Sequence, residues 1–139
     1  IPVALESWFK IKVGNYLLHG RIDRVDKHPD GTLEIIDYKT GQSKEKVTGE
    51  EKDQLLIYQI AAETLPEYNH LGSTGKLTFY YLNDLVKTSF LGEGEELNEL
   101  KTRLGNLITR IHGGDFTATP SSFVCSHCDF YSICEYRAP

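Results

Sequence analysis

Residues 20–41 read GRIDRVDKHPDGTLEIIDYKTG, and this stretch decides the fold that we predict for the chain. It holds two apolar, strand-like runs separated by the turn residues His28-Pro29-Asp30-Gly31-Thr32. Asp23 lies in the first run and Asp37 in the second, and Lys39 follows closely. Charged side chains rarely occupy buried strands without a partner. The two acids and the amine therefore require a structural or a functional explanation.

The turn predicts which residues of the two runs face each other. If the turn is centred on Asp30, Asp23 lies opposite Asp37 and Arg21 lies opposite Lys39. Opposed residues share a face, with their β-carbons roughly 5 Å apart. Strand alternation keeps Lys39 on the face of Asp37 and turns Tyr38 to the other side. One face of the hairpin then presents two carboxylates and one ammonium, unless a bulge shifts the register.

Two carboxylates at this separation repel each other and raise the pKa of one of them. A divalent cation removes the repulsion, and an oxygen-only, partly hydrated site suits Mg²⁺ or Mn²⁺ better than zinc. Lys39 would then lie beside the metal, within reach of a phosphate oxygen or an attacking water. The alternative is a cross-strand ion-pair cluster without catalytic role, which contributes little stability at a surface.

The rest of the chain alternates between strand-like and helix-like patterns. We expect an exposed loop over 41–53, since this segment is polar, charged and contains glycine. The order βββ-α-ββ-α predicts an α/β fold, with a mixed β-sheet flanked by helices and a cysteine-bearing C-terminal tail. The expected elements are strands 3–13, 16–26, 33–39, 76–82 and 85–91, and helices 52–64 and 95–112.

Size and composition fit one domain over residues 1–139. The net charge of −5 argues weakly against a free-standing nucleic-acid binder, although a nuclease needs acids to hold its metal. No apolar run approaches the roughly 20 residues of a membrane span. All three cysteines lie at or after Cys125, which is unlike a secreted disulfide framework and favours a cytoplasmic protein. The opening IPVALESW, without methionine or leader, suggests a fragment of a longer protein.

The runs GRIDRVD (20–26) and IDYKTG (36–41) resemble the PD-(D/E)xK nuclease superfamily, and more narrowly its RecB/AddB-like exonuclease branch. The resemblance implies a restriction-endonuclease-like core with Asp23 and Asp37 as metal ligands and Lys39 as the catalytic lysine. It also implies that the backbone carbonyl of Tyr38 completes the metal shell. DQLLIYQ (53–59) fits the QxxxY pattern of this branch, which implies that Gln54 and Tyr58 lie at the active site.

The segment FVCSHCDFYSIC spaces Cys125, Cys128 and Cys134 so that three thiolates could hold a soft metal or an iron–sulfur cluster. The tail is similar to that of AddB-like and iron–sulfur CRISPR-associated nucleases. The resemblance implies a 4Fe–4S cluster in the intact protein, with a fourth ligand that is missing here. A zinc site that includes His127, or unliganded thiols, are the alternatives. We expect residues 120–139 to clamp against the nuclease core.

The expected function is metal-dependent hydrolysis of DNA phosphodiester bonds, as the exonuclease of a DNA repair or recombination helicase-nuclease. The expected substrate is a single strand or a duplex end, delivered by a helicase domain or subunit. The resemblance leaves open whether this fragment is active by itself. One alternative is a catalytically incomplete module that binds DNA or scaffolds a repair complex. Another is a zinc-ribbon interaction protein built around the tail.

Overall fold

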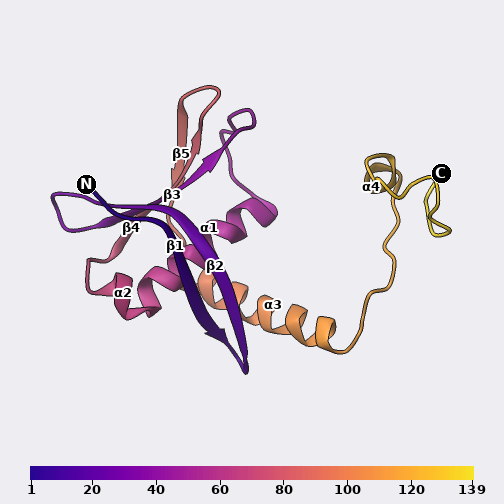
Figure 1. Cartoon of the computed structure of the whole chain (residues 1–139), viewed down its shortest axis with the longest axis horizontal. Helices are drawn as coiled ribbons and strands as arrows, with labels where there is room; N and C mark the ends of the chain where they lie inside the picture. The colour runs from indigo at the N-terminus through magenta and orange to yellow at the C-terminus, as the bar shows by residue number, and fades with distance from the viewer. The chain divides into compact units, whose positions relative to one another are not determined.

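A computed structural model describes residues 1–139 and contains a five-stranded sheet in the order β1-β2-β3-β4-β5 (Figure 1). The β3–β4 pair is parallel, and the other neighbours are antiparallel. This mixed sheet with flanking helices confirms the predicted fold class. The strands are β1 (Pro2–Val13), β2 (Tyr16–Lys27), β3 (Leu33–Lys39), β4 (Thr74–Tyr81) and β5 (Val86–Phe90).

The first three strands form the predicted meander because both of its turns hold glycine in a left-handed conformation. Gly14 has a φ of 58° and Gly31 a φ of 88°, a region that glycine occupies without steric cost. In the second turn, Oδ1 of Asp30 accepts hydrogen bonds from the amide of Thr32 at 2.9 Å and from its hydroxyl at 2.7 Å. These bonds fix the turn that joins the two acidic strands.

Strand β3 runs through the middle of the sheet, and its residues 33–37 are all buried. A near-continuous apolar run of this kind is typical of a strand that is covered on both faces. The core around it holds side chains from four strands and from three helices. Its largest fully buried members are Tyr68, Phe79, Ile22, Leu33, Ile35, Leu55, Leu56, Leu77 and Leu100.

The parallel connection from β3 to β4 passes through helix α1 (Gly49–Thr64) and the short helix α2 (Pro66–Asn69). Helix α1 contacts β1, β3 and β4, and the ring of Tyr58 meets that of Phe9 edge-on at 5.7 Å. The helix begins earlier than expected, so the predicted loop over 41–53 was too long. Glu50 and Glu51 lie in its first turn, where carboxylates interact favourably with the helix dipole.

Gly92 brings the segment after β5 close to α1. A β-carbon at this position would lie 2.4 Å from Leu56 Cδ2, so a larger residue does not fit. The side chain of Gln59 donates a hydrogen bond to the Gly92 carbonyl at 3.1 Å and accepts one from its amide at 2.9 Å. These two buried bonds fix the chain just before helix α3 (Gly94–His112), where Leu97 and Leu100 are buried.

The chain divides into two compact units, Ile1–Asn106 and Leu107–Pro139. The second unit contains the end of α3, the short helix α4 (Ser122–Ser126) and all three cysteines. Ser121 caps α4 by accepting a hydrogen bond from the amide of Val124. None of the helices combines the length and apolar composition needed to cross a membrane.

Glu34 is a buried charge that ties three strands and a turn together. One carboxylate oxygen accepts a hydrogen bond from Thr78 at 2.6 Å and lies 3.3 Å from Nζ of Lys76. The other lies 2.9 Å from Nε2 of His28, and Thr78 is itself 2.8 Å from Ser89 on β5. Burial opposes the charge of Glu34, yet these bonds together hold its pKa below the usual value.

We expect Glu34→Gln to lower the free energy of unfolding at neutral pH by about 1–3 kcal/mol, because charge-assisted bonds are replaced by neutral ones. A lowered folded pKa contributes stability above the ordinary glutamate value of 4.5, and this stability is lost as the pH falls through the folded pKa. Urea unfolding from pH 7 to pH 3 should therefore show a smaller loss of stability in the variant. Equal losses in both proteins would contradict this role of Glu34.

Candidate active site

The predicted register of β2 against β3 is confirmed, but the ladder stops just before the two aspartates. Paired residues run from Lys27–Leu33 to Arg24–Ile36. Beyond that point Oδ2 of Asp23 accepts a hydrogen bond from the amide of Tyr38 at 3.1 Å. A side chain thus takes a position where a backbone carbonyl could have bonded. Asp23 and Asp37 are the next residues after the last ladder pair, Arg24–Ile36, and the charge of Asp23 acts on Asp37.

Arg21, which was predicted to face Lys39, lies beyond the end of the ladder with β3. On its other side it pairs with Trp8 of β1, and its guanidinium carbon lies 5.7 Å from the centre of the indole. Its Nη1 is 3.5 Å from Oε2 of Glu6, an exposed side chain. The β1–β2 ladder includes Arg21, whereas the β2–β3 ladder ends at Arg24. Arg21 is therefore held by contacts with β1.

Asp37 is buried, with only 3% of the residue exposed, and it lies at the end of the central strand. Its Oδ2 is 2.8 Å from Nζ of Lys39. The angle of this contact does not suit a hydrogen bond, so Oδ2 is a buried oxygen with an ion-pair partner but no hydrogen bond. Buried carboxylate oxygens are normally satisfied. The ammonium of Lys39 is therefore the close partner of a buried oxygen that could also bind a cation.

Burial raises the pKa of Asp37 above its usual value, and the negative charge of Asp23 raises it further. The ammonium of Lys39 acts in the opposite direction but does not compensate fully. The two carboxylates are thus close enough to repel each other. A divalent cation would stabilise both charged forms, and the unbonded oxygen of Asp37 fits such an ion.

Lys39 is held from two sides by residues of different elements. Besides Asp37, its Nζ donates a hydrogen bond to Oε1 of Gln54 at 2.8 Å, and it lies 5.0 Å from the centre of the Phe79 ring. Gln54 in turn donates from Nε2 to the hydroxyl of Tyr58 at 2.9 Å. Gln54 and Tyr58 are one helical turn apart on α1, which places them on one face. The structure therefore brings together the five side chains Asp23, Asp37, Lys39, Gln54 and Tyr58.

Tyr58 remains a neutral phenol at the end of this chain of contacts. Burial raises its pKa above the usual value, and the charges of Asp37 and Asp23 add to that effect, while the bond from Gln54 opposes it. Its oxygen can therefore accept from Gln54 while keeping its proton. The amide orientation of Gln54 is fixed by these two neighbours, since Lys39 only donates hydrogen bonds.

One pocket opens beside Asp23 and another beside Lys39. One, of about 600 Å³, is lined by Leu5, Glu6, Asp23 and Tyr38. The other, of about 390 Å³, is lined by residues around Lys39, namely Lys39, Gly41, Gln42, Ser43, Lys44, Glu51 and Tyr81. An extended ligand could therefore approach both Asp23 and Lys39.

The metal ligands that these residues offer are few. The structure contains no group of three or more histidine, cysteine, aspartate or glutamate side chains arranged to hold an ion. The donors are the two carboxylates, with the Tyr38 carbonyl as the predicted third. A sparse set of hard oxygen ligands suits Mg²⁺ or Mn²⁺, which keep several waters when bound.

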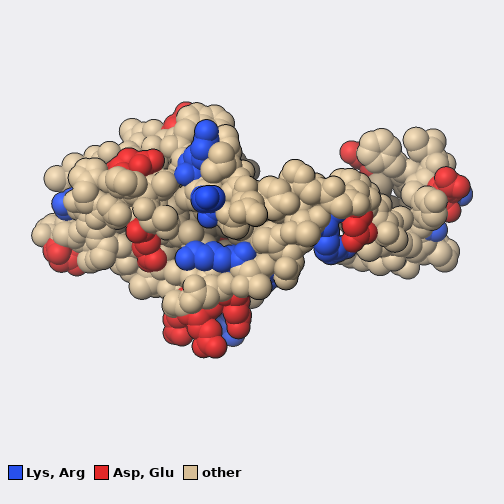
Figure 2. Space-filling view, turned by 90° about the horizontal axis from the view of Figure 1, so that it is seen from below, with Lys and Arg blue, Asp and Glu red and all other residues tan.

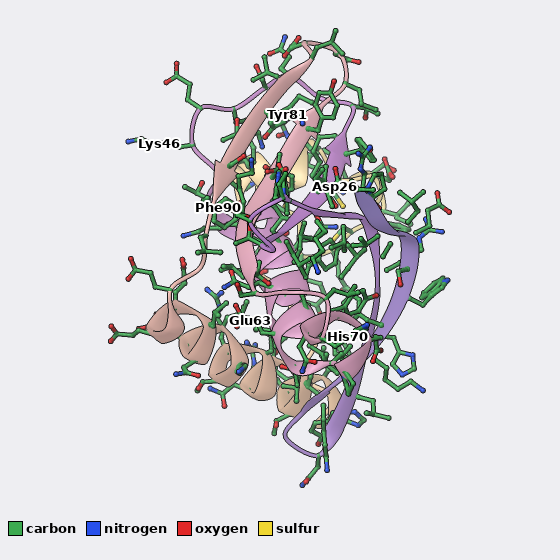
Figure 3. The ribbon with its side chains drawn as sticks, turned by 90° about the vertical axis from the view of Figure 1, so that its left-hand side faces the viewer. Asp26, Lys46, Glu63, His70, Tyr81 and Phe90 are labelled. Carbon is green, nitrogen blue, oxygen red and sulfur yellow. The ribbon has the colours of Figure 1, made fainter.

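Basic residues of the loop before α1 and of the first turn of α1 are not all available to a ligand. Lys44 lies 2.7 Å from Glu51, and Lys52 forms an ion pair with Glu96. Lys46 extends away from the rest of the protein (Figure 3). Only Lys46 of these three could meet an anionic ligand without giving up an existing partner.

The cysteines of the second unit form no disulfide, and they do not converge on a metal site in this structure. Cys125 is buried and its sulfur accepts a hydrogen bond from the Ala138 amide at 3.3 Å, whereas Cys128 is exposed. Nδ1 of His127 lies 2.9 Å from the Phe123 carbonyl, which ties this nitrogen to the backbone. The arrangement adds no support for the iron–sulfur hypothesis.

One neighbour of the site could not be predicted from sequence. Phe79 of β4 is fully buried beside Asp37 and lies under the ammonium of Lys39. Its position follows from the parallel pairing of β3 with β4, whose register no turn specifies. The apolar ring contributes to the low polarity that raises the pKa of Asp37.

Comparison with known proteins agrees with this geometry. A search of curated proteins gives no match. Among solved structures, the crystal structure of a protein named SSO0001 is similar, with a TM-score of 0.54 and 19% sequence identity. The match covers 97% of this chain but only 60% of SSO0001, and at this identity it supports the fold alone. The family model of the PD-(D/E)XK nuclease superfamily matches residues 1–135, and the chain therefore belongs to this superfamily.

Proposed function

We propose that the chain is the catalytic part of a metal-dependent nuclease that hydrolyses phosphodiester bonds in DNA. The observation that carries the proposal is the buried oxygen of Asp37, which has no hydrogen bond although Lys39 lies 2.8 Å away. A buried carboxylate oxygen without a well-formed hydrogen bond, close to the charge of a second carboxylate, suits a cation-dependent site.

A bound Mg²⁺ or Mn²⁺ would polarise the phosphoryl group and lower the pKa of a coordinated water. Asp23 and Asp37 would hold the ion, with the carbonyl of Tyr38 as a further ligand. Asp23 is kept in place by its bond from the Tyr38 amide, and Asp37 by the rigid central strand. This chain therefore positions its two carboxylates before any ligand arrives.

Lys39 would provide the positive charge next to the scissile phosphate. Its Nζ is oriented by Asp37 and by Gln54, so it can donate a hydrogen bond to a phosphoryl oxygen or orient the attacking water. Gln54 and Tyr58 are positioning residues, since they act on the phosphate only through Lys39. The pocket beside Lys39 leaves room for the substrate on that side.

The finer assignment follows the sequence resemblance. We favour an exonuclease of the RecB/AddB-like type that works with a helicase in cytoplasmic DNA repair or recombination. The alternative is a related module that binds DNA or scaffolds a repair complex without cutting. The intact Asp23, Asp37 and Lys39 favour the enzyme. The packing of residues 120–139 against the core remains a prediction.

We expect Asp37→Asn to abolish Mg²⁺-dependent cleavage of labelled DNA, and Lys39→Ala to reduce kcat by about 10²–10³-fold through lost electrostatic stabilisation. Binding of DNA in the presence of a chelator should survive both changes. Lys87→Ala is the matched control, because Lys87 lies over the Tyr80 ring of β4 rather than at the carboxylates. Undiminished cutting by both site variants would end the nuclease proposal, and binding without cutting by the wild type would favour the scaffold.

Asp37→Asn should lose activity without losing stability. Since burial raises the folded pKa of Asp37, its contribution to stability is complete below the ordinary aspartate value of 3.8 and is lost as the pH rises through the folded pKa. The neutral amide avoids this loss. Thermal unfolding between pH 4 and pH 7, without divalent cations, should show the variant gaining on the wild type as the pH rises. A constant difference would contradict the raised pKa.

We expect Gln54→Ala to lower kcat by about 10–100-fold, as for other residues that orient a catalytic group. Tyr58→Phe removes only the acceptor of the Gln54 amide and should have the smaller effect. Gln54→Glu supplies a related acceptor to Lys39 and should recover part of the activity lost in Gln54→Ala. Steady-state kinetics on one DNA substrate measure all three. A larger effect of Tyr58→Phe than of Gln54→Ala would contradict this order of contacts.

The cysteine tail is proposed to bind a 4Fe–4S cluster in the intact protein, on the resemblance alone. Anaerobic preparation of a longer protein that contains this chain should give a brown sample with iron and sulfide in equal amounts. Cys128→Ala should remove the colour. One zinc per chain would instead identify a zinc site, and neither metal would leave the cysteines as plain thiols.

A further inference from the structure

The outer face of the β1–β2 hairpin carries exposed basic and aromatic side chains that the proposed chemistry does not use. The alternation of the two strands buries Phe9, Ile11 and Val13 and leaves the opposite face open. Cross-strand pairs on the open face are Trp8 with Arg21, Lys10 with His19, and Lys12 with Leu17, and all six residues are exposed. Three of the six are cationic and none is acidic.

The charge of this face contrasts with that of the whole chain, whose net charge is −5. Lys10 and Lys12 make no ion pair within the chain, so both ammonium groups are free to meet an anion. In the view of Figure 2, several Lys and Arg side chains lie near the middle of the larger part of the protein, with Asp and Glu side chains to their left and below them. A basic face on an acidic protein indicates a polyanionic partner.

Trp8 is the most unusual member of this face. The residue is 72% exposed, although a large aromatic side chain normally buries most of its surface. The guanidinium of Arg21 lies 5.7 Å from the centre of the ring, within the range of a cation–π contact. The contact steadies the ring and leaves most of the indole open to a ligand. An exposed aromatic beside Arg is the arrangement on which unpaired nucleobases stack.

The position of this pair relates it to the carboxylates. Arg21 precedes Asp23 by two residues on β2, roughly 7 Å along the strand. Glu6, which contacts Arg21, lines the same pocket as Asp23. A nucleic-acid strand that lies along the hairpin would therefore pass from Trp8 directly to the pocket of Asp23.

We propose that Trp8 and Arg21 form a stacking station for one unpaired base of a nucleic-acid strand, with Lys10 and Lys12 binding the phosphates on its far side. Because a base inside a duplex has both faces covered, the station selects strands with unpaired bases. The inference deepens the proposed function, since it identifies the substrate class at the same site. It requires binding only and does not depend on cleavage.

Trp8 is the only tryptophan of the chain, so its fluorescence reports on this station alone. The whole chain is titrated in chelator with three probes of equal length, which are oligothymidylate, an abasic deoxyribose-phosphate strand, and a blunt duplex. We expect oligothymidylate to quench Trp8 and the abasic strand to bind without quenching. The duplex should quench least. Equal quenching by oligothymidylate and the abasic strand, or no binding of either, would overturn the proposal.

Variants separate stacking from charge. Trp8→Ala should weaken binding of a labelled oligothymidylate about 5- to 100-fold and leave the abasic strand unaffected, whereas Trp8→Phe should retain most of the affinity. Lys10→Gln and Lys12→Gln should each weaken both strands and reduce the dependence of binding on salt. Phe116→Ala, at a similarly exposed aromatic of the second unit, is the control. If Trp8→Ala weakened both strands alike, stacking would be excluded.

Two further results have defined meanings. Trp8 fluorescence that changes with protein concentration alone would show that a second copy covers this face, which overturns the proposal. Quenching by oligothymidylate without any cleavage in Mg²⁺ would support the station while contradicting the nuclease. Cleavage in Mg²⁺ without quenching of Trp8 would support the nuclease and contradict the stacking station.

Discussion

The structure depends on the cost of keeping a carboxylate charged at the end of the central strand. Asp37 is buried beside Phe79, and burial raises its pKa despite the adjacent ammonium of Lys39. A fold selected only for stability would place an apolar residue here, because a desolvated ion pair seldom recovers its solvation cost. Asp23 on β2 and Gln54 on α1 are placed around this charge, where they and Lys39 complete the candidate site.

The parting of β2 and β3 provides the space for that use. The ladder between these strands ends at Arg24–Ile36. The amide of Tyr38 then bonds to Asp23, so a carboxylate oxygen takes the place of a backbone carbonyl and the amide keeps a partner. The same bond holds Asp23 in the lining of the pocket beside Tyr38. Turn chemistry at Asp30 and Gly31 fixes the register that brings both aspartates to this point.

Much of this could be predicted from sequence because the relevant signals are local. The turn at 28–32 determined the hairpin register, and the spacing of Gln54 and Tyr58 determined their common helix face. The departure at Asp23 could not be predicted, since it results from competition between a side chain and a backbone carbonyl for one amide. The contact of Phe79 with Lys39 was equally inaccessible, because it depends on a parallel pairing across a connection of more than thirty residues. The early start of α1 at Gly49 was missed for a simpler reason. The charged residues before Asp53 resemble a loop, whereas two of them support the first turn of the helix.

The charge of the β1–β2 hairpin changes sign along its length, since Asp23 lies only two residues after Arg21 on the same face of β2. A site that holds a cation must concentrate negative charge, and a phosphate backbone is repelled by that charge at a distance. The three cations Lys10, Lys12 and Arg21 lie around Trp8 and offset this repulsion where a ligand would first arrive. Strand alternation allows these exposed side chains and the buried core residues to come from the same twelve-residue strands. Binding charge and catalytic charge can thus have opposite signs only a few residues apart.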